Sequence, residues 1–159
     1  MDIHIRCAET SDLKNLGILW MSMIKELDLS LSDPSTALKI WLNHVALLIA
    51  EDPCQVLIAH YKDLIIGYAI IELSNLVPIL RVFGYAVLTD LYVRKEWRGK
   101  GIGTLLLKKA EDIALSKGFL EVRLSVLKDA DAIRFYKNSG YEDYGIIMRK
   151  KLKINNYDL

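Results

Sequence analysis

The stretch Arg98-Gly99-Lys100-Gly101-Ile102-Gly103-Thr104 decides the fold, because it joins a predicted strand to the most regular predicted helix. The strand is expected to end near Val93, and the helix over Gly101–Lys117 has one apolar and one charged face. Backbone N–H groups at a helix N-terminus lack intrahelical acceptors and lie at the positive end of the helix dipole. Since glycines leave that backbone open, the stretch predicts a cradle for a phosphate, to which Arg98 and Lys100 add positive charge.

Two other phosphate-binding loops do not fit this spacing. A Walker loop ends in Gly-Lys followed by Ser or Thr, but here Gly101 follows Lys100. A dinucleotide-binding loop needs G-x-G-x-x-G, and its third glycine would fall on Thr104 or Leu106, depending on the register. A glycine-rich connection that binds no ligand remains an alternative when the loop is taken alone.

The rest of the chain shows helical spacing in some stretches and strand-like spacing in others. The predicted helices are Leu13–Leu27, Pro34–Ile49, Gly101–Lys117 and Asp129–Asn138. The predicted strands are Ile3–Ile5, Gln55–Tyr61, Leu64–Leu73, Gly84–Val93, Leu120–Val126 and Tyr141–Lys150, with an irregular connection at Ser74–Phe83. No repeat or low-complexity linker interrupts the pattern, so we expect a mixed α/β fold in a single domain over residues 1–159.

Composition and charge exclude several functional classes. The 159 residues are 52% hydrophobic and 26% charged, which is a globular balance. The net charge of +1 creates no overall field that would attract nucleic acid or an anionic membrane. The apolar stretches are shorter than the roughly 20 residues of a membrane-spanning helix, and the first residues run into a strand instead of a targeting signal. The sequence therefore predicts a cytoplasmic protein with no nucleic-acid or membrane partner.

The cysteines give no sign of a disulfide framework or a metal site. Cys7 and Cys54 stand in apolar, strand-like contexts, without Cys-x-x-Cys or Cys/His spacing. We therefore expect two buried thiols that take no part in the chemistry.

Two motifs in this order resemble the GNAT acetyltransferase family. The coenzyme A loop of that family reads Q/R-x-x-G-x-G/A after its fourth strand, and here the motif is filled by Arg98, Gly101 and Gly103. A second family pattern, N-x-x-A-x-x-L/F-Y-x-x-x-G-F/Y, is similar to residues 129–141, with Asp129 in place of the usual Asn. The resemblance covers residues 88–141 and implies a central, mostly antiparallel sheet that splays between its fourth and fifth strands, flanked by about four helices.

The resemblance also implies an acetyl-CoA-dependent N-acetyltransferase in which a primary amine attacks the thioester directly in a ternary complex. A backbone N–H of Leu91 would face the thioester oxygen, where negative charge develops only in the transition state. No metal is implied. The residues that would bind coenzyme A are Leu91, Tyr92, Val93, Arg98, Gly99, Lys100, Gly101, Ile102, Gly103, Thr104, Asp129, Ala132 and Tyr136.

Acid and base roles have candidates on separate elements. Tyr136 matches the family tyrosine that acts as general acid, and a tyrosine at a pKa of about 10 stays protonated above a thiol at about 8.5. Some family members have Glu where Thr89 stands, and a threonine accepts no proton at neutral pH. Asp90, expected on the opposite face of the strand, and Glu72 on the preceding strand are the candidate bases, acting directly or through ordered water.

Two functional readings share the glycine loop: an active enzyme and a catalytically silent acyl-CoA-binding module. Only the enzyme needs Tyr136 and an acceptor groove, beside which Glu26, Asp28 and Asp33 could attract a cationic amine. A dinucleotide-dependent oxidoreductase fails on the glycine spacing. The family often pairs, so Gly145–Lys150 is predicted as an edge strand of a homodimer.

Overall fold

The computed structural model describes residues 2–29, 31–73, 84–127, 130–148 and 150. The chain falls into two compact units, residues 1–125 and residues 126–159, and each is described by itself. The predicted connection at residues 74–83 and the candidate ligand Asp129 lie outside the described residues.

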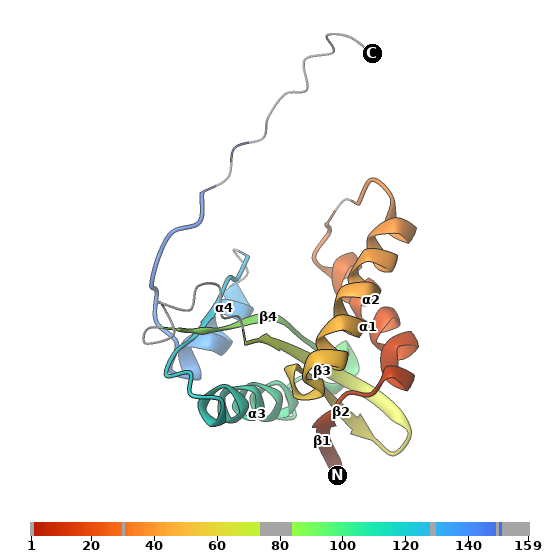
Figure 1. Ribbon diagram of the computed structural model, residues 1–159. Coiled ribbons are helices and arrows are strands. Elements are labelled where there is room, and N and C mark those ends of the chain that lie inside the picture. Colours follow the sequence, from red (N-terminus) through yellow and green to blue (C-terminus); the bar gives the residue numbers. More distant parts are fainter. Residues whose placement is uncertain (1, 30, 74–83, 128–129, 149, 151–159) are drawn as a thin grey trace. The chain divides into compact units, whose positions relative to one another are not determined.

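A five-stranded sheet forms the centre of the first unit (Figure 1). The strands are Ile3–Cys7 (β1), Val56–Tyr61 (β2), Leu64–Glu72 (β3), Ala86–Val93 (β4) and Val122–Leu124 (β5), in the spatial order β1-β2-β3-β4-β5. Pairing is antiparallel from β1 to β4, whereas β5 runs parallel to β4. The predicted mixed, mostly antiparallel sheet is therefore confirmed.

Two helices, Leu13–Glu26 (α1) and Pro34–Glu51 (α2), pack together against the sheet. The start of α2 is fixed by Asp33, whose side chain accepts hydrogen bonds from the backbone N–H groups of Ser35 and Thr36 at 3.0 and 3.1 Å. Burial of apolar area drives the packing, and one connected core joins both helices to β2, β3 and β4. Its members include Leu16, Leu19, Val45, Leu48, Val56, Ile58, Tyr68, Ile70 and Tyr92.

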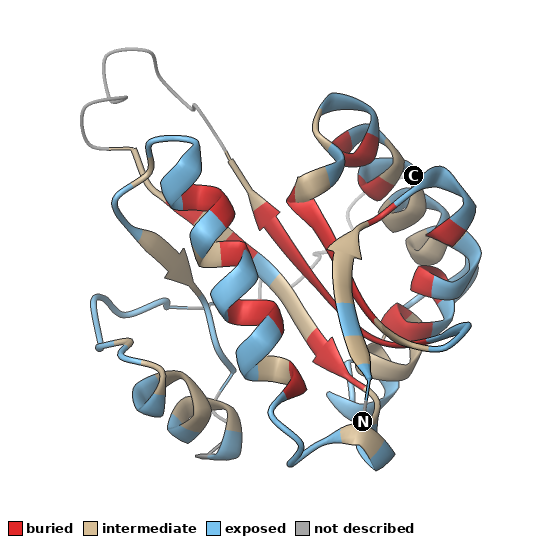
Figure 2. Cartoon of the chain, turned by 90° about the horizontal axis from the view of Figure 1, so that it is seen from below, coloured by how far each residue is buried: buried red, intermediate tan, exposed pale blue. Residues whose placement is uncertain are grey.

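A third helix, Ile102–Ser116 (α3), covers the opposite face of the sheet, as its buried stripe of Ile102, Leu106 and Ala110 requires. Its close approach depends on Gly67 of β3. A Cβ atom at Gly67 would lie 2.8 Å from the carbonyl oxygen of Tyr92 and 3.4 Å from the side chain of Leu106. The buried residues accordingly line the strands and the sheet-facing sides of the helices (Figure 2).

The expectation of two free thiols is wrong, because Cys7 and Cys54 form a disulfide. Both cysteines are also half-buried instead of buried. The pairing of β1 with β2 places Cys7 opposite Leu57, and the short 3-10 helix Pro53–Gln55 turns Cys54 back toward it. The two Cα atoms lie 4.6 Å apart. Strand register brings the two thiols together, and their sequence separation of 47 residues gives no hint of that register.

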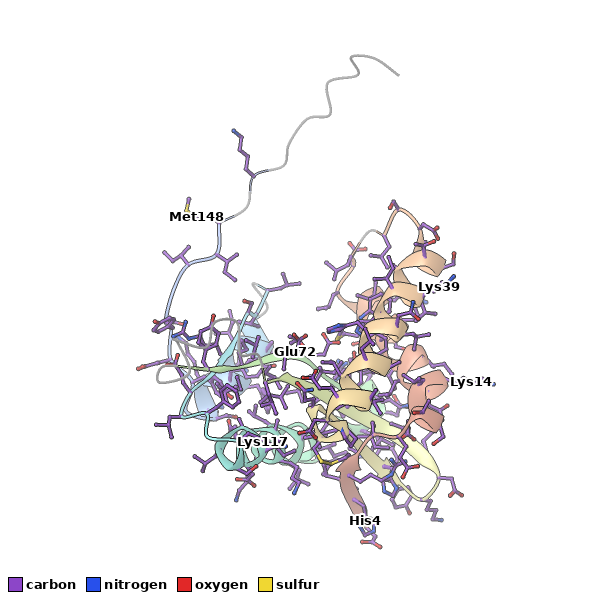
Figure 3. All side chains as sticks on the ribbon, viewed as in Figure 1. His4, Lys14, Lys39, Glu72, Lys117 and Met148 are labelled. Carbon is purple, nitrogen blue, oxygen red and sulfur yellow. A yellow bond between two sulfur atoms is a disulfide. The ribbon has the colours of Figure 1, made fainter. Side chains whose placement is uncertain are left out.

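The second unit contains the helix Ala130–Asn138 (α4), which ends where Gly140 takes a φ of +91°. The predicted strand over Tyr141–Lys150 is wrong, since residues 141–148 form no strand. Ile146 and Met148, the latter labelled in Figure 3, are 91% and 90% exposed. An apolar alternation becomes a strand only when a neighbour pairs with its backbone, and the described part of this unit offers none. Homodimerisation through this segment stays a prediction.

Candidate active site

Two glycines of the loop adopt the left-handed backbone conformation. After β4, a 3-10 helix at Lys95–Trp97 leads into Gly99 and Gly101, whose φ angles are +73° and +77°. This left-handed region strains residues that carry a Cβ atom. Apart from the adjoining residues, no atom of the described part of the chain lies within 4 Å of the Cβ position at either glycine, so the loop surface there is open.

Helix α3 begins directly behind the loop and presents unused backbone donors. Its first intrahelical hydrogen bond runs from the N–H of Leu105 to the carbonyl of Gly101 at 3.0 Å. The N–H groups of Ile102, Gly103 and Thr104 therefore have no carbonyl acceptor within the helix. An open surface, free donors and a positive helix end fit a pyrophosphate, which is the part of coenzyme A that the sequence assigns to this loop.

The two cations of the loop are both engaged by other groups of the protein. Lys100 donates to the backbone carbonyl of Glu96 at 3.1 Å, and its ammonium lies 4.8 Å from the centre of the Trp97 ring. Arg98 donates through Nε to the carbonyl of Val93 at 2.9 Å, and through Nη2 to Glu26 at 2.6 Å. The guanidinium of Arg98 is thus directed toward β4 and α1.

Strand β4 leaves its parallel neighbour early. Pairing with β5 ends at Leu88, whereas pairing with β3 continues to Val93. The N–H of Arg94 bonds to Ile66 of β3 at 2.9 Å, and alternate residues of a strand point their N–H and C=O groups to opposite sides. Leu91 and Val93 therefore direct these groups away from β3, into the gap beyond Leu88. The carbonyl of Val93 is taken by Arg98, so the groups that face the gap are the N–H and C=O of Leu91 and the N–H of Val93. The role of Leu91 at the thioester stays a prediction.

Asp90 lies on the face of β4 that is covered by α2. Its Oδ2 atom accepts hydrogen bonds from Trp41 Nε1 at 3.1 Å and from Tyr68 Oη at 3.3 Å. Burial raises the pKa of Asp90 above its ordinary value, against the hydrogen bonds from Trp41 and Tyr68, which lower it. Every fully buried side-chain nitrogen or oxygen among the described residues has a partner. Within the described ranges, Oδ1 of Asp90 accepts no hydrogen bond, so it is not one of the fully buried oxygens.

A β-bulge sets the direction of Asp90. Ile70 and Ile71 of β3 pair with Asp90 and Leu88, so Thr89 is an extra residue in β4. Thr89 is exposed, whereas Asp90 is half-buried among the side chains of α2 and β3. The prediction that these two neighbours point to different environments is confirmed.

Glu72, the last residue of β3 and labelled in Figure 3, is the second candidate base. One of its oxygens lies 3.1 Å from Nε2 of His44 on α2. Its charge contributes to the raised pKa of Asp90, while that of His44 acts in the opposite direction. The side chain of Glu72 is 30% exposed.

Aromatic side chains that sequence reasoning did not assign to the site surround Asp90. The rings of Trp20 and Trp41 stack with centroids 5.3 Å apart, and Trp41 meets Tyr68 edge-on at 5.9 Å. Tyr68 lies 6.3 Å from Tyr92. The helical stripe of α2 identified Trp41 as a core residue, but no sequence signal paired it with Asp90, 49 positions away.

Tyr92 contacts α1 through its side chain. Its hydroxyl donates to Oε1 of Glu26 at 2.6 Å, and burial together with this carboxylate raises its pKa to about 12. The ring lies 5.4 Å from the guanidinium of Arg98. The side chain of Tyr92 therefore belongs to the packing between β4, α1 and the loop.

The remaining predicted site residues lie on α4, in the second unit. The ring of Tyr136 meets those of Phe135 and Tyr141 at centroid distances of 5.1 and 5.7 Å. The backbone N–H of Tyr141 donates to the carbonyl of Tyr136 at 3.0 Å, which closes the helix end. Ala132 lies one helical turn before Tyr136 on the same face. The roles of both residues stay predictions.

In this fold, β4 continues beyond the end of its pairing with the parallel strand β5, and the glycine loop follows β4. This is the architecture expected for the coenzyme A-dependent acyltransferases. The sequence profile described as "Acetyltransferase (GNAT) family" matches residues 20–141. The chain belongs to this family, so the resemblance seen in its two motifs is confirmed.

Curated relatives match a shorter stretch. Thialysine N-epsilon-acetyltransferase from Mus musculus is 44% identical over 57 residues, which cover 35% of this chain and 34% of that protein. An uncharacterised N-acetyltransferase from Methanocaldococcus jannaschii is 36% identical over 63 residues, covering 39% and 28%. The matched stretches thus span about a third of the length of these relatives.

Solved structures share the fold. A predicted acetyltransferase from Clostridium acetobutylicum, solved with acetyl-CoA, superimposes with a TM-score of 0.74 at 17% identity, covering 94% of this chain and 96% of that one. The PaiA N-acetyltransferase from Thermoplasma acidophilum, solved with coenzyme A, gives 0.66 at 23% identity, covering 89% and 91%. At such identities the likeness establishes the fold alone.

Within the described residues, no group of three or more His, Cys, Asp or Glu side chains is arranged to hold a metal ion. None of the described helices is both long and apolar enough to span a membrane. The cytoplasmic location stays a prediction.

Proposed function

We propose that this protein transfers the acetyl group of acetyl-CoA to a primary amine by direct attack in a ternary complex. The observation that carries the proposal is Asp90, a half-buried carboxylate with a raised pKa, placed on the strand whose backbone is open beyond Leu88. A module that only binds acyl-CoA needs the open strand and the loop. A binding module does not need a carboxylate such as Asp90, in which two donors hold one oxygen and the other oxygen is not fully buried.

Each chemical task has a candidate in the chain. The backbone N–H groups of Ile102, Gly103 and Thr104 would hold the pyrophosphate of the acetyl donor, which supplies an activated thioester. The N–H of Leu91 would donate to the carbonyl oxygen as it gains negative charge. These donors stabilise charge through fixed backbone dipoles.

Proton transfer falls to side chains. An amine attacks only when neutral, and Asp90 Oδ1 would accept a proton from the acceptor ammonium, directly or through a water molecule. A raised pKa makes Asp90 a better base than an ordinary aspartate. Tyr136 would donate its hydroxyl proton to the departing thiolate, as the resemblance implies. Glu72 is the alternative base, and its contact with His44 at the end of β3 supports that role less well.

The acceptor is proposed to be a lysine-like amine on a flexible aliphatic stem. The curated relatives include thialysine N-epsilon-acetyltransferases, whose name denotes a terminal amine of this kind. The carboxylates of Asp90 and Glu72 would attract its positive charge, and the Trp41 ring offers an apolar surface to its methylene groups.

The test is thiol release from acetyl-CoA across a panel of amines. The panel comprises lysine and its thioether analogue, a polyamine, and a peptide with a free N-terminus. We expect release that depends on the amine, with matching formation of the acetylated product by mass spectrometry. Binding of acetyl-CoA without thiol release for any amine would favour the silent module, and failure to bind acetyl-CoA would refute both functions.

A further inference from the structure

A polar network beside the glycine loop centres on Glu26, the last residue of α1. Its two carboxylate oxygens accept separate hydrogen bonds, Oε1 from Tyr92 and Oε2 from Arg98, both at 2.6 Å. Although burial acts to raise its pKa, the bonds from Tyr92 and Arg98 lower the pKa of Glu26 below its ordinary value. Glu26 is thus the charged partner of the arginine that begins the cofactor loop.

Arg98 extends this network into the backbone of β4. Its Nε donates to the carbonyl of Val93 at 2.9 Å, and its guanidinium lies against the Tyr92 ring. One arginine thus ties together the end of the strand, the start of the loop and the end of α1. Held in this way, Arg98 occupies the Val93 carbonyl, so the backbone of Leu91 and the N–H of Val93 are what the strand offers in the gap.

We propose that Glu26 is a positioning residue for the cofactor site, acting through Arg98. It holds the guanidinium against Val93 and so fixes the end of β4 and the start of the glycine loop before the cofactor arrives. Backbone N–H groups then bind the pyrophosphate, and Arg98 braces the loop instead of pairing with phosphate. This inference rests on the proposed use of acetyl-CoA.

The opposite role for Arg98 predicts the opposite sign. If Arg98 were a direct ligand of the pyrophosphate, Glu26 would compete for it and repel the anion. Removing the charge of Glu26 would then tighten coenzyme A binding. If Glu26 positions the site, removing its charge loosens the loop and weakens binding. The sign of the change in affinity separates the two roles.

The experiment is calorimetric titration of coenzyme A and of pantetheine, which lacks the pyrophosphate, into wild type and Glu26→Gln. Because the ion pair is partly exposed, we expect a loss of about two- to fivefold in affinity for coenzyme A. Pantetheine should also bind more weakly, since the strand end is displaced. Tighter or unchanged coenzyme A binding would overturn the proposal.

Asp28 supplies a matched control two residues away. It is exposed, and its side chain has no hydrogen bond or ion pair within the described part of the chain. Asp28→Asn removes the same charge from the same region, and should leave both affinities within error of wild type. If Asp28→Asn lost as much affinity as Glu26→Gln, the effect would come from the loss of negative charge in this region, and the positioning role of Glu26 would be refuted.

A double-mutant cycle with Arg98→Gln tests whether Glu26 acts through Arg98. We expect Glu26→Gln to cause no further loss of affinity in the Arg98→Gln background, because both changes break the same ion pair. Additive losses would contradict the mechanism. Melting temperatures show whether each variant is folded, and Tyr92→Phe, which removes one bond to Glu26, should give a smaller loss of the same sign. If wild type itself fails to bind coenzyme A, the proposed function fails, not this inference alone.

Discussion

The glycine loop, the proposed cofactor site, and the Asp90 cluster lie at the end and the middle of the same strand, but they are built in different ways. The loop works through backbone: two glycines in the left-handed region and the first N–H groups of α3, all within residues 99–104. The cluster works through side chains from α2, β3 and β4. A site made of backbone groups is formed by consecutive residues, so the local sequence indicates it. A site made of side chains from distant segments forms only when the sheet and its helices pack together.

The largest expected effect is on Asp90→Asn, which keeps the shape of the side chain but cannot take up a proton. As general base, Asp90 should contribute about 10²–10⁴ to the rate of acetyl transfer. The variant should lose the acidic limb of the profile of kcat/KM against pH. Glu72→Gln is the matched comparison, and it should retain most of the activity. If Glu72→Gln lost more activity than Asp90→Asn, Glu72 would be the general base.

The same substitution should stabilise the fold. The pKa of Asp90 is raised by burial, so the ionised carboxylate is less favourable in the folded chain than in the unfolded one. Its contribution to folding is therefore present below the unfolded pKa and is lost as pH rises through the folded pKa. At neutral pH, Asp90→Asn should melt at a higher temperature than wild type. A lower melting temperature would show that the charge supports the structure.

Tyr136→Phe should give the next largest effect, about 10² in turnover, because it removes a proton donor and keeps the ring contacts with Phe135 and Tyr141. Affinity for coenzyme A should change little. Steady-state kinetics with a true acceptor, beside calorimetry, measures both quantities. Wild-type turnover across the alkaline range would remove Tyr136 as the acid, and a joint loss of stability and affinity would assign it a structural role.

A smaller effect is expected for Trp41→Phe, which removes one of the two donors to Asp90. The indole N–H stabilises the ionised carboxylate, so its loss should raise the pKa of Asp90 further. The acidic limb of the pH profile should then shift to higher pH, while kcat at its optimum stays within about threefold of wild type. If the acidic limb shifted to lower pH or did not shift, Trp41 would not control the pKa of the general base.

This contrast explains what could be predicted from the sequence. The open glycine loop and the helix behind it were predicted from residues 98–104, because glycines and helix N-termini leave local signals. Asp90 was found as a candidate, but Trp41 and Tyr68, which hold it, were not. The partners of Glu26 were missed for the same reason, since they lie 66 and 72 positions away.

Two errors have the same origin. Cys7 and Cys54 are joined through the register of β1 and β2, which cannot be deduced from cysteine spacing. The alternation in residues 141–150 looked like a strand, but an alternating pattern specifies only which side chains share a face. Whether a partner strand pairs with it depends on the rest of the fold.

Binding of acetyl-CoA to Gly101→Val tests the central claim, that the backbone of residues 98–104 is the cofactor site. Valine at a φ of +77° distorts the loop and covers its open surface. Gly118→Val imposes similar strain at a φ of +88° beyond the far end of α3, and serves as the control. Calorimetry should show acetyl-CoA binding to wild type and to Gly118→Val, and none to a folded Gly101→Val protein. Equal affinity in all three would contradict the claim.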